Sequence, residues 1–156
     1  MLDPVRLRII GSLLDAIAED MGIALERAGI SPNIKERLDH SCAIFDADGD
    51  LVSQAAHIPV HLGAMPMAVK AARQHVPFED GDVVLVNDPA LGGTHLPDIT
   101  AIQALRIHPS DALPIAYVAN RAHHADVGGI VPGSMGLTEQ LSDEGEHYYQ
   151  KNNKGF

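Results

Sequence analysis

Hydrophobic residues near the start of the chain recur at steps of three and four, which is the spacing of an amphipathic helix. Asp3 and Pro4 supply an N-cap and a proline for the first helical position, and Gly29 offers a left-handed stop. The pattern predicts a helix over about 4–28, whose apolar face covers the protein's own core or meets a partner helix. The periodic positions are Ile10, Leu13, Leu14, Ile17, Met21 and Leu25.

After residue 41 the pattern changes to short apolar runs separated by turn residues. An Asp48-Gly49 turn divides two such runs and predicts a β-hairpin over 42–53. Pro66 can start a short helix that ends before Pro77. Further strands are predicted at 82–86, 99–107 and 114–119.

Two His-x-x-Asp steps stand out, each in a glycine-rich loop after an apolar run. The first joins His95 to Asp98 and the second joins His123 to Asp126. For one step alone an ordinary turn is the favoured explanation, but repetition in a matching glycine context favours a metal site. Two imidazoles and two carboxylates suit a divalent ion such as Mn or Zn. The predicted fold is therefore α+β, with an N-terminal amphipathic helix, a β-hairpin and a mixed β-sheet whose Gly-rich loops carry the metal site.

Composition narrows the functional classes. The chain has 156 residues, enough for one hydrophobic core, and its formal net charge of -10 repels nucleic acid and anionic lipid. No apolar run approaches the roughly 20 residues that span a bilayer. The single Cys42 cannot form an internal disulfide, and no signal-peptide pattern opens the chain, so the cytoplasm is the expected compartment.

Four stretches of the sequence are informative together: SPNIKERLDHS (31–41), HIPVHLG (57–63), NDPALGGTHLPD (87–98) and RAHHADVGG (121–129). In this order they resemble the hydantoinase B/oxoprolinase family. The resemblance covers nearly all of residues 1–140 and implies a metal-containing subunit of ATP-dependent enzymes that open cyclic amides such as hydantoins and 5-oxoproline. A subunit of an acetone- or acetophenone-type carboxylase is the alternative that the same resemblance leaves open.

The resemblance also implies a partner chain. Gly92-Gly93 is not followed by the lysine and hydroxyl residue of a Walker loop, and the chain shows no nucleotide fingerprint of its own. We therefore expect ATP on a separate hydantoinase A type subunit, within a hetero-oligomer that acts on a small cyclic amide.

Within the second loop, two adjacent histidines compete for the ligand role. His123 has the spacing that the family motif requires, whereas His124 occupies a variable place in it. Arg121 is the predicted catalytic residue, because a guanidinium can neutralise an anionic intermediate with two hydrogen bonds. A structural ion pair from Arg121 to Asp88 or Asp98 is an equally good explanation.

Three other residues with reactive side chains receive less weight. Cys42 lies in an apolar run and is expected to be a buried strand residue. His57 and His61 flank a proline, which favours extended backbone over a shared helical face. Structural roles are favoured for both histidines, although the resemblance places their segment near the reaction centre.

The C-terminal residues depart from the family pattern. We divide the chain into 1–140, the N-terminal part of a hydantoinase B/oxoprolinase-type domain, and 141–156, a divergent and frayed tail rich in polar residues. Family members are several times longer than this chain. A truncated, catalytically silent metal-binding module is therefore the second functional hypothesis beside the enzyme subunit.

Overall fold

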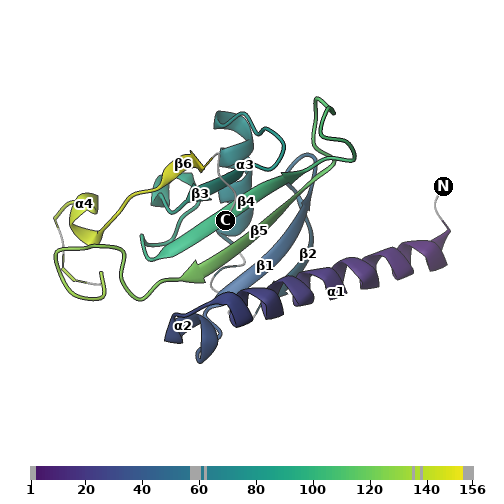
Figure 1. Ribbon diagram of the computed structural model, residues 1–156. Coiled ribbons are helices and arrows are strands. Elements are labelled where there is room, and N and C mark those ends of the chain that lie inside the picture. Colours follow the sequence, from purple (N-terminus) through teal and green to yellow (C-terminus); the bar gives the residue numbers. More distant parts are fainter. Residues whose placement is uncertain (1–2, 57–60, 62, 135, 138, 153–156) are drawn as a thin grey trace.

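The long N-terminal helix forms where the hydrophobic spacing predicts it. The computed structural model describes residues 3–56, 61, 63–134, 136–137 and 139–152, and α1 spans Pro4–Ala28 (Figure 1). The Asp3 carboxylate accepts the Val5 N–H as N-cap. Gly29 ends the helix with φ -65°, so the predicted left-handed stop is wrong. Glycine is needed there because a Cβ would press against Ile34 of α2 (Pro32–Lys35).

One antiparallel sheet forms the centre of the molecule, with the strand order β2-β1-β5-β4-β3-β6. Every pairing among the described strands is antiparallel, so the prediction of a mixed sheet is wrong. The consecutive pairs β1–β2, β3–β4 and β4–β5 are joined by turning back, whereas α3 (Met65–His75) lies on the connection from β2, at one edge, to β3. The strands are β1 (His40–Asp46), β2 (Leu51–Ala56), β3 (Val83–Val86), β4 (Asp98–Leu105), β5 (Ala116–His123) and β6 (Tyr149–Asn152).

The predicted hairpin and short helix are confirmed. β1 and β2 pair across a turn in which the Asp46 carboxylate accepts the N–H groups of Asp48 and Asp50, and Gly49 has φ +81°. The short helix is α3 (Met65–His75). The predicted strand at 114–119 extends to His123, because its pairing with β1 and β4 continues that far.

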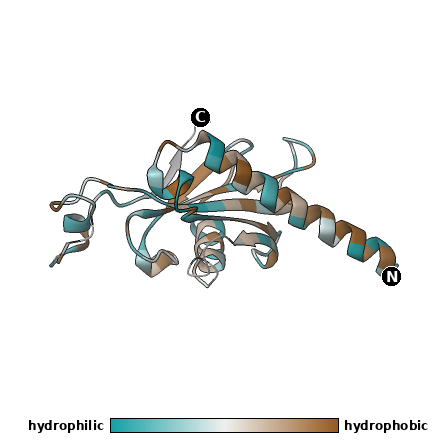
Figure 2. Ribbon diagram, turned by 90° about the horizontal axis from the view of Figure 1, so that it is seen from below, coloured by the Kyte–Doolittle hydropathy of each residue, from teal (hydrophilic) through white to brown (hydrophobic). Residues whose placement is uncertain are grey.

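The sheet lies between α1 and α3, with a separate hydrophobic cluster on each face (Figure 1 and Figure 2). The larger cluster packs α3 against inward-facing residues of β1, β3, β4 and β5, with Phe45 and Ile102 fully buried. The smaller cluster packs Ala18 of α1 against Ile44 and Ala55. The α3 face is therefore the principal core, and the candidate site lies at one end of it.

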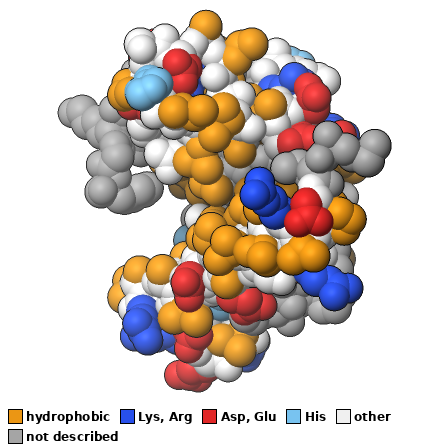
Figure 3. Space-filling model, turned by 90° about the vertical axis from the view of Figure 1, so that its right-hand side faces the viewer, with side chains coloured by type: hydrophobic (Ala, Val, Ile, Leu, Met, Phe, Trp, Pro, Cys, Tyr) orange, Lys and Arg blue, Asp and Glu red, His pale blue; other side chains and the backbone are white. Residues whose placement is uncertain are grey.

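The N-terminal part of α1 extends beyond the sheet and leaves apolar side chains in solvent (Figure 1). Val5, Ile9 and Leu13 are each more than half exposed. Figure 3, which views the molecule from the side toward which this end of α1 points, shows hydrophobic side chains gathered in surface patches. Contiguous apolar surface of this kind is typical of a protein interface.

The residues assigned to a frayed tail include two short elements, α4 (Leu141–Glu144) and β6. β6 pairs with β3, and the Asn87 side chain accepts the Tyr148 N–H just before it. The division of the chain at residue 140 stays a prediction. Among the described helices, none has the length and apolar content needed to cross a membrane.

Candidate metal centre

Strand register brings the two predicted motifs together. Asp98 is the first residue of β4 and His123 is the last residue of β5, and the two are directly paired. Because antiparallel neighbours run in opposite directions, the start of one strand meets the end of the other. Side chains of paired residues lie on the same face of a sheet. The register alone therefore places this carboxylate beside this imidazole.

The loop before β4 folds back so that His95 joins them. Asp88 accepts the Ala90 N–H and starts the 3₁₀ helix η2 (Pro89–Leu91), after which Gly92 adopts φ +91°. A Cβ on Gly92 would overlap the backbone at Ala68 of α3, and one on Gly93 would overlap the Asn87 carbonyl. The two glycines thus serve close backbone packing, which holds the loop against α3 and the end of β3.

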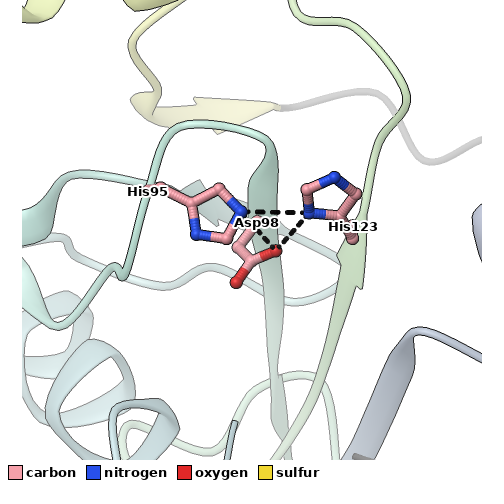
Figure 4. A group of neighbouring side chains, drawn as sticks. All are labelled: His95, Asp98 and His123. Carbon is pink, nitrogen blue, oxygen red and sulfur yellow. Dashed lines mark hydrogen bonds and ion pairs between the residues drawn. The ribbon is translucent and has the colours of Figure 1, made fainter. Parts of the chain in front are cut away.

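Three donor atoms converge at this end of the sheet: His95 Nε2, Asp98 Oδ1 and His123 Nδ1 (Figure 4). The two imidazole nitrogens are 3.0 Å apart, and the carboxylate oxygen is 3.0 Å from His123 and 3.4 Å from His95. Exposure increases across the group, from 2% for the Asp98 side chain through 17% for His123 to 35% for His95. The cluster is therefore anchored in the protein and open to solvent on one side.

This geometry fits a divalent ion. Bonds of about 2.1 Å to tetrahedral or octahedral zinc place neighbouring donor atoms about 3.0–3.5 Å apart, which matches the three separations. Two histidines and one carboxylate are a common ligand set for Zn and for non-haem Fe, and the solvent side leaves room for water or substrate. His95, Asp98 and His123 could together hold such an ion.

Asp98 is held in its charged form. Burial by itself would raise the pKa of its carboxyl, but the imidazole of His61, a hydrogen bond from the Thr94 hydroxyl and the neighbouring His95 and His123 lower the pKa well below the usual range. An ionised carboxylate is the form that binds a cation.

The structure does not bring Asp126 to the cluster. Its exposed carboxylate accepts the N–H groups of Gly128 and Gly133 and the hydroxyl of Ser134. These hydrogen bonds lower the pKa of Asp126. Only the first His-x-x-Asp step delivers both of its side chains, because its aspartate begins a strand, whereas Asp126 lies in a loop that has left the sheet.

Arg121 is fully buried, away from any solvent-exposed substrate position. Its Nε donates to Thr100 Oγ1 at 2.7 Å and its Nη2 donates to the Gly92 carbonyl at 2.6 Å. Among the described residues, Arg121 forms neither of the predicted ion pairs, to Asp88 or to Asp98. Burial lowers the pKa of Arg121, and the negative charge of Asp98 acts in the opposite direction. The guanidinium instead ties the sheet to the glycine loop that carries His95.

His123, and not His124, lies in the cluster. Successive strand residues alternate between the two faces, so the neighbouring histidine points away from it. Burial and then the charge of His123 lower the pKa of His124.

Two neighbours of the cluster were not predicted as site residues: the sequence favoured a structural role for His61, and it gave no role to Asp39. His61 is fully buried, with Nε2 3.6 Å from Asp98 Oδ2 and 3.7 Å from Asp39 Oδ1. The Asp39 carbonyl accepts the His123 N–H, which fixes this second carboxylate beside the cluster. Both residues lie in stretches that carry the family resemblance, which is the signal that could have identified them. His57 is outside the described residues.

Cys42 is buried in β1, as predicted, and its side chain faces α1 rather than the cluster. Burial, helped by the negative charge of Glu19, raises the pKa of Cys42 to about 12. Because only the thiolate reacts rapidly, we expect iodoacetamide at pH 8 to label the native protein far more slowly than the urea-unfolded protein. Equal labelling rates, followed by mass spectrometry, would contradict this burial.

Comparison with known proteins places the chain in a defined group. A sequence model described as hydantoinase B/oxoprolinase matches residues 3–149. The 5-oxoprolinase of Saccharomyces cerevisiae is 45% identical over 153 residues, a match that covers 96% of this chain and 12% of the yeast protein.

Two solved structures share the fold. An ATP-dependent caprolactamase from Pseudomonas jessenii superimposes with a TM-score of 0.83 at 26% identity, covering 97% of this chain and 26% of that one. Nucleotide-free acetone carboxylase superimposes with a TM-score of 0.85 at 23% identity, covering 98% of this chain and 20% of that one. The chain spans 11% to 26% of the length of the first curated relatives that it matches.

Proposed function

This chain belongs to the hydantoinase B/oxoprolinase family, and we propose that it is the metal-binding N-terminal part of a subunit that hydrolyses cyclic amides, such as hydantoins or 5-oxoproline, at the expense of ATP. The observation that carries the proposal is the convergence of His95 Nε2, Asp98 Oδ1 and His123 Nδ1 within 4.8 Å of one another. A Mn or Zn ion held there would polarise a ring carbonyl or the oxygen that attacks it.

The protein side chains divide the work around such an ion. His95 and His123 supply nitrogen donors on the open side, where a substrate could enter. Asp98 supplies negative charge from the buried side, with its second oxygen held by Thr94. Arg121 keeps the Gly92 carbonyl, and with it the loop that carries His95, in place.

The ATP-binding step belongs to a partner in this proposal. The two glycines that begin the His95 loop are occupied by close backbone packing, which leaves no phosphate cradle at that point. The exposed apolar side chains of α1, among them Val5, Ile9 and Leu13, offer a surface for a hydantoinase A type subunit or for further parts of a longer chain.

A ketone-carboxylating subunit is the second candidate, because the acetone carboxylase structure has the same fold. The silent metal-binding module is the third, because the chain spans a small part of its relatives' length. All three candidate functions include the metal site, and they differ in the reaction, if any, that the protein catalyses.

The test measures metal content first and turnover second. We expect elemental analysis of the purified chain to find about one divalent ion per chain. We expect ATP-dependent ring opening of hydantoin or 5-oxoproline only from a longer family chain containing this sequence together with its hydantoinase A type partner. The 156-residue chain, alone or with that partner, should be inactive.

Each outcome separates the candidates. A chain that retains no divalent ion contradicts the metal site, and turnover by the isolated chain contradicts the need for a partner. Failure of the longer assembly on cyclic amides, with carboxylation of acetone or acetophenone, would favour the carboxylase. Tight stoichiometric ATP binding by the isolated chain in calorimetry would contradict the placement of ATP on the partner.

A further inference from the structure

His61 is a buried histidine whose two ring nitrogens face different chemistry. Nδ1 lies 3.0 Å from the Ser41 hydroxyl oxygen. Nε2 has no hydrogen-bond partner among the described residues, and the two oxygens nearest to it in ion-pair geometry belong to Asp98, at 3.6 Å, and Asp39, at 3.7 Å. A buried nitrogen without a hydrogen bond is uncommon and calls for a physical explanation.

The two carboxylates determine which nitrogen carries the proton. If Nδ1 carried it, the lone pair of Nε2 would face two negatively charged groups in a buried site, which is repulsive. If Nε2 carries it, the N–H points at both carboxylates and the Ser41 hydroxyl donates to Nδ1. The two carboxylates therefore select the tautomer in which Nε2 carries the proton, and the Ser41 hydroxyl, which can donate or accept, donates to Nδ1.

Two other roles for this group fit the structure less well. Ser41, His61 and a carboxylate have the composition of a nucleophilic triad. Ser41, however, is only 2% exposed and lies in β1, which is paired on both sides, so its hydroxyl cannot reach a substrate. A nitrogen that carries a proton also has no lone pair for an ion, so His61 in this tautomer is not a metal ligand.

We propose that His61 is a positioning residue for the metal centre. Its Nε2–H donates to Asp98 Oδ2 and so keeps the carboxylate in the orientation that turns Oδ1 toward His95 and His123. The inference rests on the proposed metal site. The present 3.6 Å separation is longer than a hydrogen bond, and the positioning role requires the Asp98 carboxylate to rotate toward His61 until the contact closes. Thr94 already donates to the same oxygen. With the His61 N–H as a second donor, Oδ2 would be fully engaged and Oδ1 would be left for the ion.

The consequence is measurable as metal affinity. Loss of an outer hydrogen bond to a metal-binding carboxylate costs about 10–100-fold in affinity. We expect His61→Leu, which keeps side-chain volume and removes the donor, to weaken Zn²⁺ binding by that factor in a chelator-competition titration. His61→Gln, whose amide keeps a donor near the Nε2 position, should recover most of the loss, and Ser41→Ala should have an intermediate effect.

His40→Leu is the matched control. His40 is equally buried and directly precedes Ser41 in β1, so its side chain lies on the opposite face of the sheet. Both leucine variants remove a buried imidazole, and both should lower the melting temperature of the metal-free protein. Only His61→Leu should also weaken Zn²⁺ binding and change the visible absorption spectrum of the Co²⁺-loaded protein.

The outcomes separate this inference from the proposed function. If the wild-type chain binds neither Zn²⁺ nor Co²⁺, the metal site itself is wrong. If the wild type binds Zn²⁺ and His61→Leu binds it equally well, the positioning role is wrong. If His61→Gln is as defective as His61→Leu, the donor assignment is overturned in favour of direct ligation by the imidazole.

Discussion

Replacing His123 with alanine should abolish stoichiometric metal binding. Its Nδ1 lies 3.0 Å from both the His95 nitrogen and the Asp98 oxygen, so its loss removes one of three donors and opens the site further to water. We expect a loss of affinity greater than the roughly 100-fold that a missing outer-shell partner can cost. His95→Ala and Asp98→Asn should have effects of the same order, measured by chelator competition and by elemental analysis after dialysis.

Thermal unfolding gives an independent measurement. An ion that binds only the folded state stabilises it by about 2.7 kcal/mol when its concentration is 100 times the dissociation constant. Added Zn²⁺ should therefore raise the melting temperature of the wild type and leave that of the three variants unchanged. His124→Ala is the control, because His124 lies outside the donor group and should keep the ion. A variant lacking His124 that loses the ion, while His123→Ala keeps it, would reverse the ligand assignment.

Two carboxylates compete to complete the coordination. Asp126 was predicted from its spacing, but three hydrogen bonds from Gly128, Gly133 and Ser134 already occupy its oxygens. Asp39 lies beside His61 and is fixed by the backbone bond to His123. We expect Asp39→Asn to weaken metal binding more than Asp126→Asn. If Asp126→Asn weakens it more, the site predicted from two equivalent His-x-x-Asp steps, with Asp126 as a ligand, would be supported instead.

The elements of the fold could be predicted from local pattern. Helical spacing with an N-cap identified α1, and a turn between apolar runs identified the hairpin of β1 and β2. Strand direction could not be read this way, because a buried apolar run looks the same in parallel and antiparallel sheets. The expectation of a mixed sheet failed for this reason.

The site was predictable as a set of residue types but not as a geometry. Repetition of His-x-x-Asp implied that each step gives one histidine and one aspartate to the metal site. Whether both side chains of a step reach the site depends, however, on where the neighbouring strand begins or ends. Asp98 starts β4, which pairs it with His123, whereas Asp126 falls three residues after the end of β5. His61 and Asp39 reach the cluster through tertiary packing, for which spacing carries no signal.

Replacing Arg121 with alanine should destabilise the fold severely. The side chain is fully buried, and its truncation leaves a large cavity and a buried Gly92 carbonyl without its donor. Truncating a large buried side chain to alanine costs about 2–5 kcal/mol, a large share of the 5–15 kcal/mol that holds a typical domain folded. Urea unfolding of the metal-free protein, with a chelator present, measures the change without a contribution from the ion.

Arg121→Met is the control, because it restores most of the volume and leaves only the hydrogen bonds unmade. Its cost should be smaller, about 1–3 kcal/mol for the unsatisfied Gly92 carbonyl. The two variants together distinguish an anchor of the glycine loop from a residue that neutralises an anionic intermediate. If Arg121→Ala unfolds at the same urea concentration as the wild type and the longer assembly carrying it loses turnover, the guanidinium acts on substrate. If stability falls from the wild type to Arg121→Met and further to Arg121→Ala, the guanidinium serves to hold Gly92, and through it His95, against the sheet.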